Sequence, residues 1–248
     1  GGGGGNVLLH PPSSFHTHHR YILLAVAFVM ELFLGGLAFG WSALSLMLKD
    51  EGIYSSECTP EELASEEGTC DAQELRLAVV WTVSAVFMNC GPAFTGILLD
   101  KFGPQIMASA GAAAVAVGLA VYSISSDHFD GFPLGAAFVS LGGITFHLSC
   151  FNIGNLFPTR RGLVTSMFVG GFTLSGQVYL VLYTIYGALG SSKGAYKGVM
   201  AGHSVLLAVC SAIIFCTFPR RSIKPGQTLV SRKSRLLVVE LDAGGGAG

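Results

Sequence analysis

Residues 21–48 read YILLAVAFVMELFLGGLAFGWSALSLML, a stretch in which Glu31 is the only charged residue. A helix needs about 20 apolar residues to cross the hydrocarbon core of a bilayer. The stretch is too long for the apolar core of a secretory signal, and no clean small-residue cleavage site follows it. It therefore predicts a transmembrane helix.

Five more runs of the chain have similar length and apolar character: residues 75–99, 104–125, 132–157, 163–189 and 199–218. Of the 248 residues, 51% are hydrophobic and 12% charged, against about 25% charged in a typical soluble domain. In water, six such helices would lack the polar stripe that a soluble bundle turns to solvent. We predict an all-α, polytopic membrane protein with six transmembrane helices.

The distribution of basic residues predicts the orientation. With a cytoplasmic N-terminus, ten Lys and Arg lie inside, and the four outside are Lys49, Arg76, Lys193 and Lys197. Cytoplasmic loops carry the excess of Lys and Arg, so both termini are predicted to be cytoplasmic. We expect a disordered tail over residues 1–20, the six-helix unit over 21–218, and a tail or the start of a central loop over 219–248. The plasma membrane is the default location, and an organelle membrane remains open.

The long loop over residues 49–74 is predicted to be extracellular. It is acidic, with Glu57, Glu61, Glu62, Glu66, Glu67 and Asp71, and we interpret it as a solvated loop rather than a binding surface. Cys58 and Cys70 lie in it, and a disulfide is permitted outside the cytoplasm, although spacing alone leaves the pairing open. Cys90, Cys150, Cys210 and Cys216 are expected to pack inside helices. His16, His18 and His19 are interpreted as part of the flexible tail, and no metal site is predicted.

Polar and small residues recur at helical spacing inside the runs. The stripes are Glu31, Gly35, Ala38, Ser42 and Ser45 in the first run; Thr82, Ala85, Asn89, Pro92 and Gly96 in the second; Ser140, Gly143, His147, Cys150 and Gly154 in the fourth; and Ser166, Gly170, Thr173, Gln177 and Thr184 in the fifth. Spacings of three and four residues put each stripe on one side of its helix. Polar groups in hydrocarbon are costly and usually face other helices or a water-filled path.

Two interpretations of these stripes stay open. Small residues and hydroxyls pack helices together, which accounts for most of the Gly, Ala and Ser. The same account is weaker for Glu31, Asn89, His147, Asn152 and Gln177, which are candidates for a solute path; Glu31 is alternatively a structural acid bonded to a neighbour. Tyr179 and Tyr183 are either path residues or interfacial aromatics.

The second and third runs are joined by Gly96-Ile-Leu-Leu-Asp100-Lys101-Phe-Gly103-Pro104. This segment resembles the G-x-x-x-D-[RK]-x-G motif of the major facilitator superfamily. Glycine permits close helix approach at Gly96 and a tight turn at Gly103. Asp100 can interact with a helix N-terminus, and the further basic residues usual in the motif are absent.

Two other segments resemble solute carrier family 43, sodium-independent transporters of large neutral amino acids within that superfamily. One comprises Glu31-Leu-Phe-Leu, Gly40-Trp41-Ser-Ala-Leu and the residues from Leu48 to Cys58. The other runs from Phe151-Asn152 through Phe157-Pro158 to Arg160-Arg161-Gly162. The resemblance covers the first five helices, and one member of the family is associated with purine nucleobases.

The resemblance implies the N-terminal half, a 3+3 inverted repeat, of a twelve-helix fold whose solute site lies between two halves. The chain then needs a missing C-terminal half or a second copy. The expected solute-binding residues are Glu31, Gly35, Gly36, Gly40, Asn89, His147, Asn152, Gln177, Tyr179 and Tyr183. The expected cytoplasmic gate comprises Gly96, Asp100, Lys101, Gly103, Arg160 and Arg161.

The leading hypothesis is facilitated, alternating-access transport of small solutes, most consistent with neutral amino acids. Alternatives are nucleobase transport, proton-coupled transport through Glu31 or His147, and a transport-inactive protein that binds a partner. No phosphate-cradling loop, H-E-x-x-H motif or nucleophile elbow is found. We therefore predict no enzyme activity and no cofactor. The near-neutral net charge of −1 gives no reason to expect nucleic-acid binding.

Overall fold

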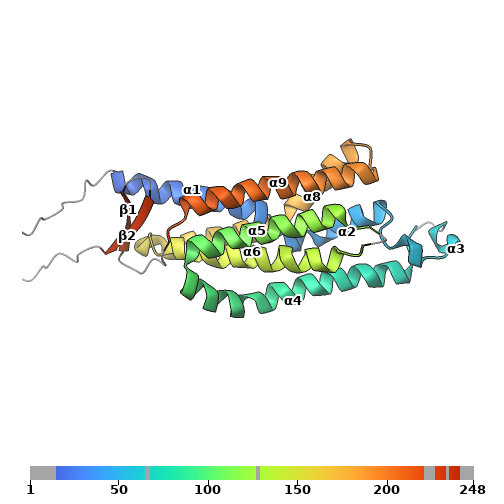
Figure 1. Cartoon of the computed structure of the whole chain (residues 1–248), viewed down its shortest axis with the longest axis horizontal. Helices are drawn as coiled ribbons and strands as arrows, with labels where there is room; N and C mark the ends of the chain where they lie inside the picture. Colours follow the sequence, from blue (N-terminus) through green and yellow to red (C-terminus); the bar gives the residue numbers. More distant parts are fainter. Residues whose placement is uncertain (1–14, 65–67, 127–128, 221–226, 233–234, 241–248) are drawn as a thin grey trace, which may run out of the picture.

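The computed structural model describes residues 15–64, 68–126, 129–220, 227–232 and 235–240. Its main elements are α1 (Phe15–Leu34), η1 (Leu37–Gly40), α2 (Trp41–Asp50), η2 (Ser55–Glu57), α3 (Pro60–Leu63), α4 (Asp71–Phe102), α5 (Pro104–Ile124), α6 (Phe132–Gly154), η3 (Pro158–Arg160), α7 (Arg161–Leu174), α8 (Gln177–Ala188), α9 (Lys193–Thr217), β1 (Gln227–Arg232) and β2 (Arg235–Glu240). The helices form an elongated bundle, with α3 at one end and the β1–β2 hairpin at the other (Figure 1).

The prediction of six membrane-spanning helices is confirmed by length and composition. The six segments are His19–Asp50, Asp71–Phe102, Pro104–Ile124, Phe132–Gly154, Pro158–Ala188 and Gly194–Thr217. Large apolar side chains remain exposed along all six of them, as expected for a surface in contact with lipid. The 3+3 inverted repeat stays a prediction.

Both ends of the chain differ from the sequence-based expectation. α1 begins at Phe15, so residues 15–20, including three histidines, are helical and not a disordered tail; residues 1–14 lie outside the described residues. At the other end, β1 and β2 form an antiparallel hairpin with Gln227 opposite Glu240. The hairpin lies beside the start of α1 (Figure 1), which adds a small strand element to the all-α bundle.

The turn between α4 and α5 follows from Gly103. Its φ of +81° lies in the left-handed region that favours glycine, which confirms the predicted tight turn. Pro104 then opens α5, because the first helical position needs no amide hydrogen.

Close helix approach through small residues is realised between α5 and α6. A Cβ atom added to Gly118 would stand 2.7 Å from the carbonyl oxygen of Gly135, and one added to Gly142 would stand 2.6 Å from that of Gly111. These glycines let two backbones meet in a membrane, where small residues drive helix packing. α5 also packs against α9, and α4 packs against α6.

Two of the six membrane segments are broken, whereas residues 21–48 and 163–189 were each expected to form one helix. The first segment unwinds at Gly35 and Gly36 between α1 and η1. The fifth unwinds at Ser175 and Gly176 between α7 and α8. Both breaks fall near the middle of their segments, His19–Asp50 and Pro158–Ala188. Glycine weakens helix continuity, and the Gly36 amide freed at the first break finds its partner across the bundle, at Ser175.

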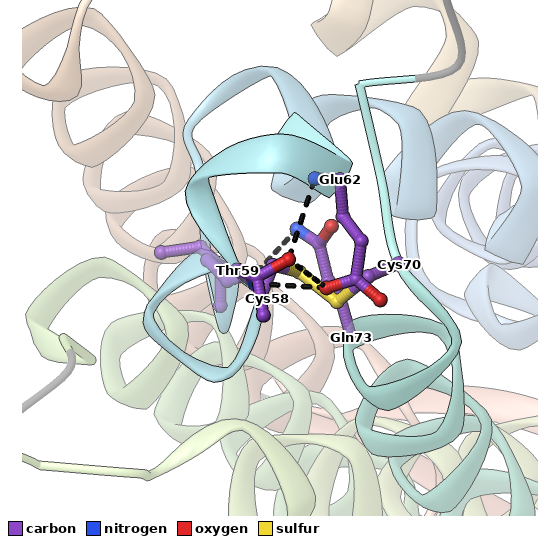
Figure 2. Close-up of a disulfide and its surroundings, with 6 residues drawn as sticks. Cys58, Thr59, Glu62, Cys70 and Gln73 are labelled. Atoms are coloured by element: carbon purple, nitrogen blue, oxygen red, sulfur yellow. Dashed lines mark hydrogen bonds between the residues drawn. A yellow bond between two sulfur atoms is a disulfide. The ribbon is translucent and has the colours of Figure 1, made fainter. Parts of the chain in front are cut away.

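The long loop is fastened at one point by a disulfide (Figure 2). Cys58 and Cys70 are joined, with their Cα atoms 5.7 Å apart. Beside them, Thr59 and Glu62 form a capping box that begins α3, and the backbone amide of Thr59 lowers the pKa of the Glu62 carboxyl. Gln73 of α4 donates to the carbonyl oxygen of Ile53 at 2.8 Å, which ties the loop to the bundle.

The acidity of this loop is partly neutralised by ion pairs. Glu57 accepts from Arg76 at 2.9 Å, and Glu74 pairs with Lys49. All four side chains are partly exposed, so each pair contributes little to stability. Tyr54 donates to Asp130 at 2.5 Å, and burial together with this carboxylate raises the pKa of the Tyr54 hydroxyl.

Candidate functional site

The two broken segments cross each other at their breaks. The amide of Gly36 donates to the hydroxyl oxygen of Ser175 at 2.5 Å, so the unwound backbone of one segment is capped by the break of the other. A Cβ atom on Gly36 would stand 2.2 Å from the carbonyl oxygen of Phe172, and one on Gly40 would stand 2.2 Å from that of Gly176. The two segments therefore touch backbone to backbone, as only glycine allows.

Helix α6 joins this crossing as a third element. A Cβ atom on Gly143 would stand 2.0 Å from the carbonyl oxygen of Gly35, so α6 lies directly against the first break. One turn further along α6 comes His147. Its side chain therefore reaches the last part of α1, where Glu31 is located.

Glu31 and His147 form a buried pair. The Oε1 atom of Glu31 lies 2.6 Å from Nδ1 of His147, and the two residues are 0% and 5% exposed. The second carboxylate oxygen, Oε2, is buried and has no hydrogen-bond partner of ordinary geometry among the described residues, and the thiol of Cys150 is a further polar neighbour of this carboxyl group. A hydrogen bond in such a low-dielectric interior is strong, and an unpaired group there is costly.

Aromatic rings enclose the histidine side of this pair. The rings of Phe151 and Phe172 have centroids 4.6 and 4.2 Å from that of His147. Phe172 belongs to α7, next to the second break. One cluster therefore contains the buried pair, both breaks and Gly143 of α6.

The predicted tyrosines lie on the α2 and α8 side of the crossing. Tyr179 is buried against Gly40, and its hydroxyl has no partner among the described residues. Tyr183 donates to Asp50 at 3.0 Å. Tyr186, one turn further along α8, donates to Glu51 at 2.6 Å. The sequence analysis did not select this residue.

Three predicted residues do not join the buried pair. Asn89 faces outward on α4 and donates to the carbonyl oxygen of Ala85 at 2.7 Å, so its own helix satisfies one amide hydrogen. Gln177 is exposed at the start of α8, and Asn152 is partly exposed near the end of α6. These amides lie on the outer surface of the chain as described.

In the second segment, Thr82 and Asn89 of the predicted stripe are exposed, so they do not pack against the other described helices, and a water-filled path stays a prediction for this segment. Its inward face is made by other residues: Ser84 bonds to Ser140 at 2.5 Å, and Thr95 bonds to Thr145 at 3.0 Å. Spacing could not tell these inward hydroxyls from the outward amide of Asn89. By contrast, the stripe of the fourth segment, which contains His147, is buried as expected.

The predicted gate residues lie around the turn between α4 and α5 and at the start of α7, and most of them are exposed. Asp100, Lys101, Arg160 and Arg161 are all exposed, and Lys101 lies 5.5 Å from the ring centroid of Phe102. A Cβ atom on Gly96 would meet nothing within 4 Å. The expected close helix approach at Gly96 is therefore wrong within the described part of this chain.

Within the described ranges, no group of three His, Cys, Asp or Glu side chains is placed to hold a metal ion. The polar contacts of the site are instead hydrogen bonds between side chains and unwound backbone. Such an arrangement can bind a small polar solute or bend.

Comparison with known proteins places these features in context. The chain is 30% identical over 171 residues to protein FMP42 of Saccharomyces cerevisiae, covering 67% of this chain and 33% of that protein. It is 28% identical over 226 residues to arginine transporter 1 of Toxoplasma gondii, covering 87% and 42%. It is 27% identical over 180 residues to large neutral amino acids transporter small subunit 3 of Mus musculus, covering 68% and 32%.

Other relatives include equilibrative nucleobase transporter 1 of Bos taurus, 26% identical over 78% of this chain and 39% of that protein, and an MFS-type transporter of Aspergillus fumigatus, 26% identical over 44% and 25%. The chain is a major-facilitator-like membrane protein. No protein-family profile matches it. The major-facilitator-like chain spans about a third to two-fifths of the length of the first relatives named.

Proposed function

We propose that the protein moves small solutes across a membrane by alternating access, with neutral amino acids as the principal class. The crossing of two broken segments beside the buried Glu31–His147 pair carries this proposal. In secondary transporters, discontinuous helices near the bilayer midplane typically mark the solute site. A broken helix also offers a place to bend.

The names of the relatives favour amino acids over other solutes. Two are named for arginine or for large neutral amino acids, and one for nucleobases. An amino acid carries an ammonium and a carboxylate group. The unpartnered Oε2 atom of Glu31 suits the ammonium, and the N-terminus of α8 at exposed Gln177 suits the carboxylate. Asn89 would contribute from the outward face of α4.

Bending at the breaks would give access to the buried carboxylate. α1 packs against α7, and α2 packs against α8. The halves before the two breaks therefore form one pair of helices, and the halves after the breaks form the other. The bonds from Tyr183 to Asp50 and from Tyr186 to Glu51 join the α2–α8 pair at its outer end. We expect this pair to move as one unit about the two breaks.

The orientation and the gate remain part of the proposal. Both termini would be cytoplasmic, in the plasma membrane, with Asp100, Lys101, Arg160 and Arg161 forming a cytoplasmic gate against the second half of a twelve-helix fold. A Cys substituted at exposed Lys101 should react with a membrane-impermeant maleimide only in permeabilised cells. Labelling in intact cells would refute this orientation.

Radiolabelled solute uptake tests the proposal. Cells that express the full-length protein should take up leucine in preference to adenine, and arginine is the third solute to compare. Glu31→Ala should abolish this uptake, while Gly170→Ala should leave it unchanged, because a Cβ atom there meets nothing within 4 Å.

The uptake assay also distinguishes the alternative functions. Adenine uptake would keep the transport function and assign it to nucleobases. No uptake of any of the three solutes by well-folded protein at the cell surface would favour a protein that binds a partner. Normal uptake by Glu31→Ala would remove Glu31 from the solute site.

Proton coupling is a second candidate, because an ionisable pair is buried within the membrane segments. Glu31 or His147 would then carry the proton. Substrate addition to proteoliposomes should change their internal pH if coupling exists. A constant internal pH during measurable uptake would leave facilitated transport.

A further inference from the structure

A groove of about 480 Å³ lies between α1, α8 and α9. Phe33 of α1 lies at one side of it, and Leu182 and Ile185 of α8 line a wall. Gly198 and Gly202 line the wall that α9 contributes, and a Cβ atom on either would meet nothing within 4 Å. The two glycines leave open a volume in the range of small-molecule sites.

His203 is the polar side chain in this apolar groove. It is 5% exposed, and neither Nδ1 nor Nε2 has a hydrogen-bond partner among the described residues. The backbone of Phe33 is a polar neighbour of the ring, but a carbonyl oxygen can only accept. A neutral imidazole has one donor and one acceptor nitrogen, so its acceptor nitrogen needs a donor from elsewhere.

The position of His203 limits what can supply that donor. It follows the start of α9 at Lys193 by ten residues, about 15 Å at 1.5 Å per residue, which is about half the thickness of the hydrocarbon core. A phospholipid tail at this depth carries no donor. A water molecule needs two to four polar partners, and here it would find only the imidazole and the backbone of Phe33, which is the lower limit.

The charge of the groove limits the ligand further. No Lys, Arg, Asp or Glu is among its described lining residues. An anionic or cationic head group would therefore be buried without a counter-charge, which is costly. The fitting ligand is uncharged, mostly apolar and equipped with one hydrogen-bond donor.

We propose that this groove is a lipid-facing binding site for a lipophilic molecule that carries a single hydroxyl group. Both ring nitrogens of His203 are buried in the empty groove, so the imidazole turns toward the groove to accept from the hydroxyl, and the apolar body lies along Gly198 and Gly202. The groove shares α1 and α8 with the proposed solute path, but none of its lining residues belongs to the Glu31–His147 pair or to the rings that enclose it. It therefore stands whether or not the protein transports amino acids.

Photolabelling with a matched pair of probes tests this site. The full-length protein in lipid vesicles is labelled with a diazirine derivative of 1-decanol and with the corresponding decane, which lacks the hydroxyl. Labelled peptides are located by mass spectrometry. One neutral hydrogen bond contributes about 1 kcal/mol, so the alcohol should label α8 and α9 roughly fivefold more than the alkane.

Three variants separate the hydrogen bond to His203 from the apolar contact along the glycines of α9. His203→Phe keeps a ring of similar size but removes both nitrogens, and it should make labelling by the alcohol and the alkane equal. Gly202→Leu should fill the groove and reduce labelling by both probes. Gly170→Leu on α7 is the control, because a Cβ atom there also meets nothing within 4 Å and Gly170 does not line the groove; it should change neither signal.

Other results would overturn the proposal. Equal labelling of the unaltered protein by the two probes would mean that His203 does not recognise a hydroxyl. Labelling that falls as the protein-to-lipid ratio rises, with crosslinks between two copies, would show that a second copy fills the groove instead. Unchanged preference in His203→Phe would place the hydroxyl elsewhere.

Discussion

Gly143→Ala tests the packing of α6 against the first break. The added Cβ atom would stand 2.0 Å from the carbonyl oxygen of Gly35, where ordinary van der Waals contact begins at 3.4 Å. The two backbones must therefore separate by roughly 1.4 Å. Overpacking of this kind costs about 1–3 kcal/mol, and at about 2–4 °C per kcal/mol for a chain of this size the melting temperature should fall by roughly 2–12 °C.

The assay is thermal unfolding of detergent-purified protein, followed by the fluorescence of a thiol-reactive dye. Gly170→Ala is the matched control, because its Cβ atom meets nothing within 4 Å and alanine favours a helix more than glycine does. We expect no loss of stability in the control. If Gly143→Ala melted with the control, the close approach of α6 to the break would be refuted.

Three further substitutions address the other contacts. His147→Phe should destabilise the protein by about 3–5 kcal/mol, because the buried Glu31 carboxylate loses its partner. Adding Glu31→Gln to this variant should restore part of the melting temperature. If His147→Phe melted at the same temperature as the unaltered protein, the pairing would be contradicted. Ser175→Ala should cost about 1–3 kcal/mol by leaving a buried amide at the first break unpaired, and a Ser175→Thr variant that keeps the hydroxyl serves as comparison in the same assay. Replacing Cys58 and Cys70 together by Ser should lower the stability of the loop by up to about 3 kcal/mol, given the 12-residue separation of the two cysteines. The measurement is the rate of proteolysis of the loop, which should rise. An unchanged rate would mean that the ion pairs hold the loop without the disulfide.

The six spans and the α4–α5 turn could be predicted because both depend on local properties. The length of an apolar run determines whether a helix can cross a bilayer, and the run needs no knowledge of its neighbours. The turn depends on the backbone freedom of Gly103. Each span, and the turn, can be predicted from fewer than 30 consecutive residues.

The two breaks could not be predicted in the same way. Gly35 and Gly36 inside an apolar run indicate close packing as readily as unwinding. The first break is stabilised by the hydroxyl of Ser175, which lies 139 residues away in the sequence. The acceptor that makes unwinding favourable is thus known only once the two segments are side by side.

Asn89 shows a second limit of helical spacing. The cost of a polar group in hydrocarbon predicts that it faces another helix or a water-filled path. Asn89 is exposed in this chain, and its amide donates to Ala85 one turn earlier. The helix itself supplies a partner, which lowers the cost of facing outward. Polarity within a span therefore indicates a need for hydrogen bonds and does not by itself give the direction of the side chain.

Glu31 unites the two interpretations that its position in the sequence left open. As a structural acid, it joins α1 to α6 through Oε1 and His147. As a solute ligand, it still has Oε2 without a partner. An ammonium group that binds Oε2 would contact a carboxylate held at the junction of the two breaks, so its affinity would depend on how the segments are bent. A ligand shifts a conformational equilibrium only through such a difference in affinity, and in this chain Glu31 offers the contact through which a solute could bias the bend.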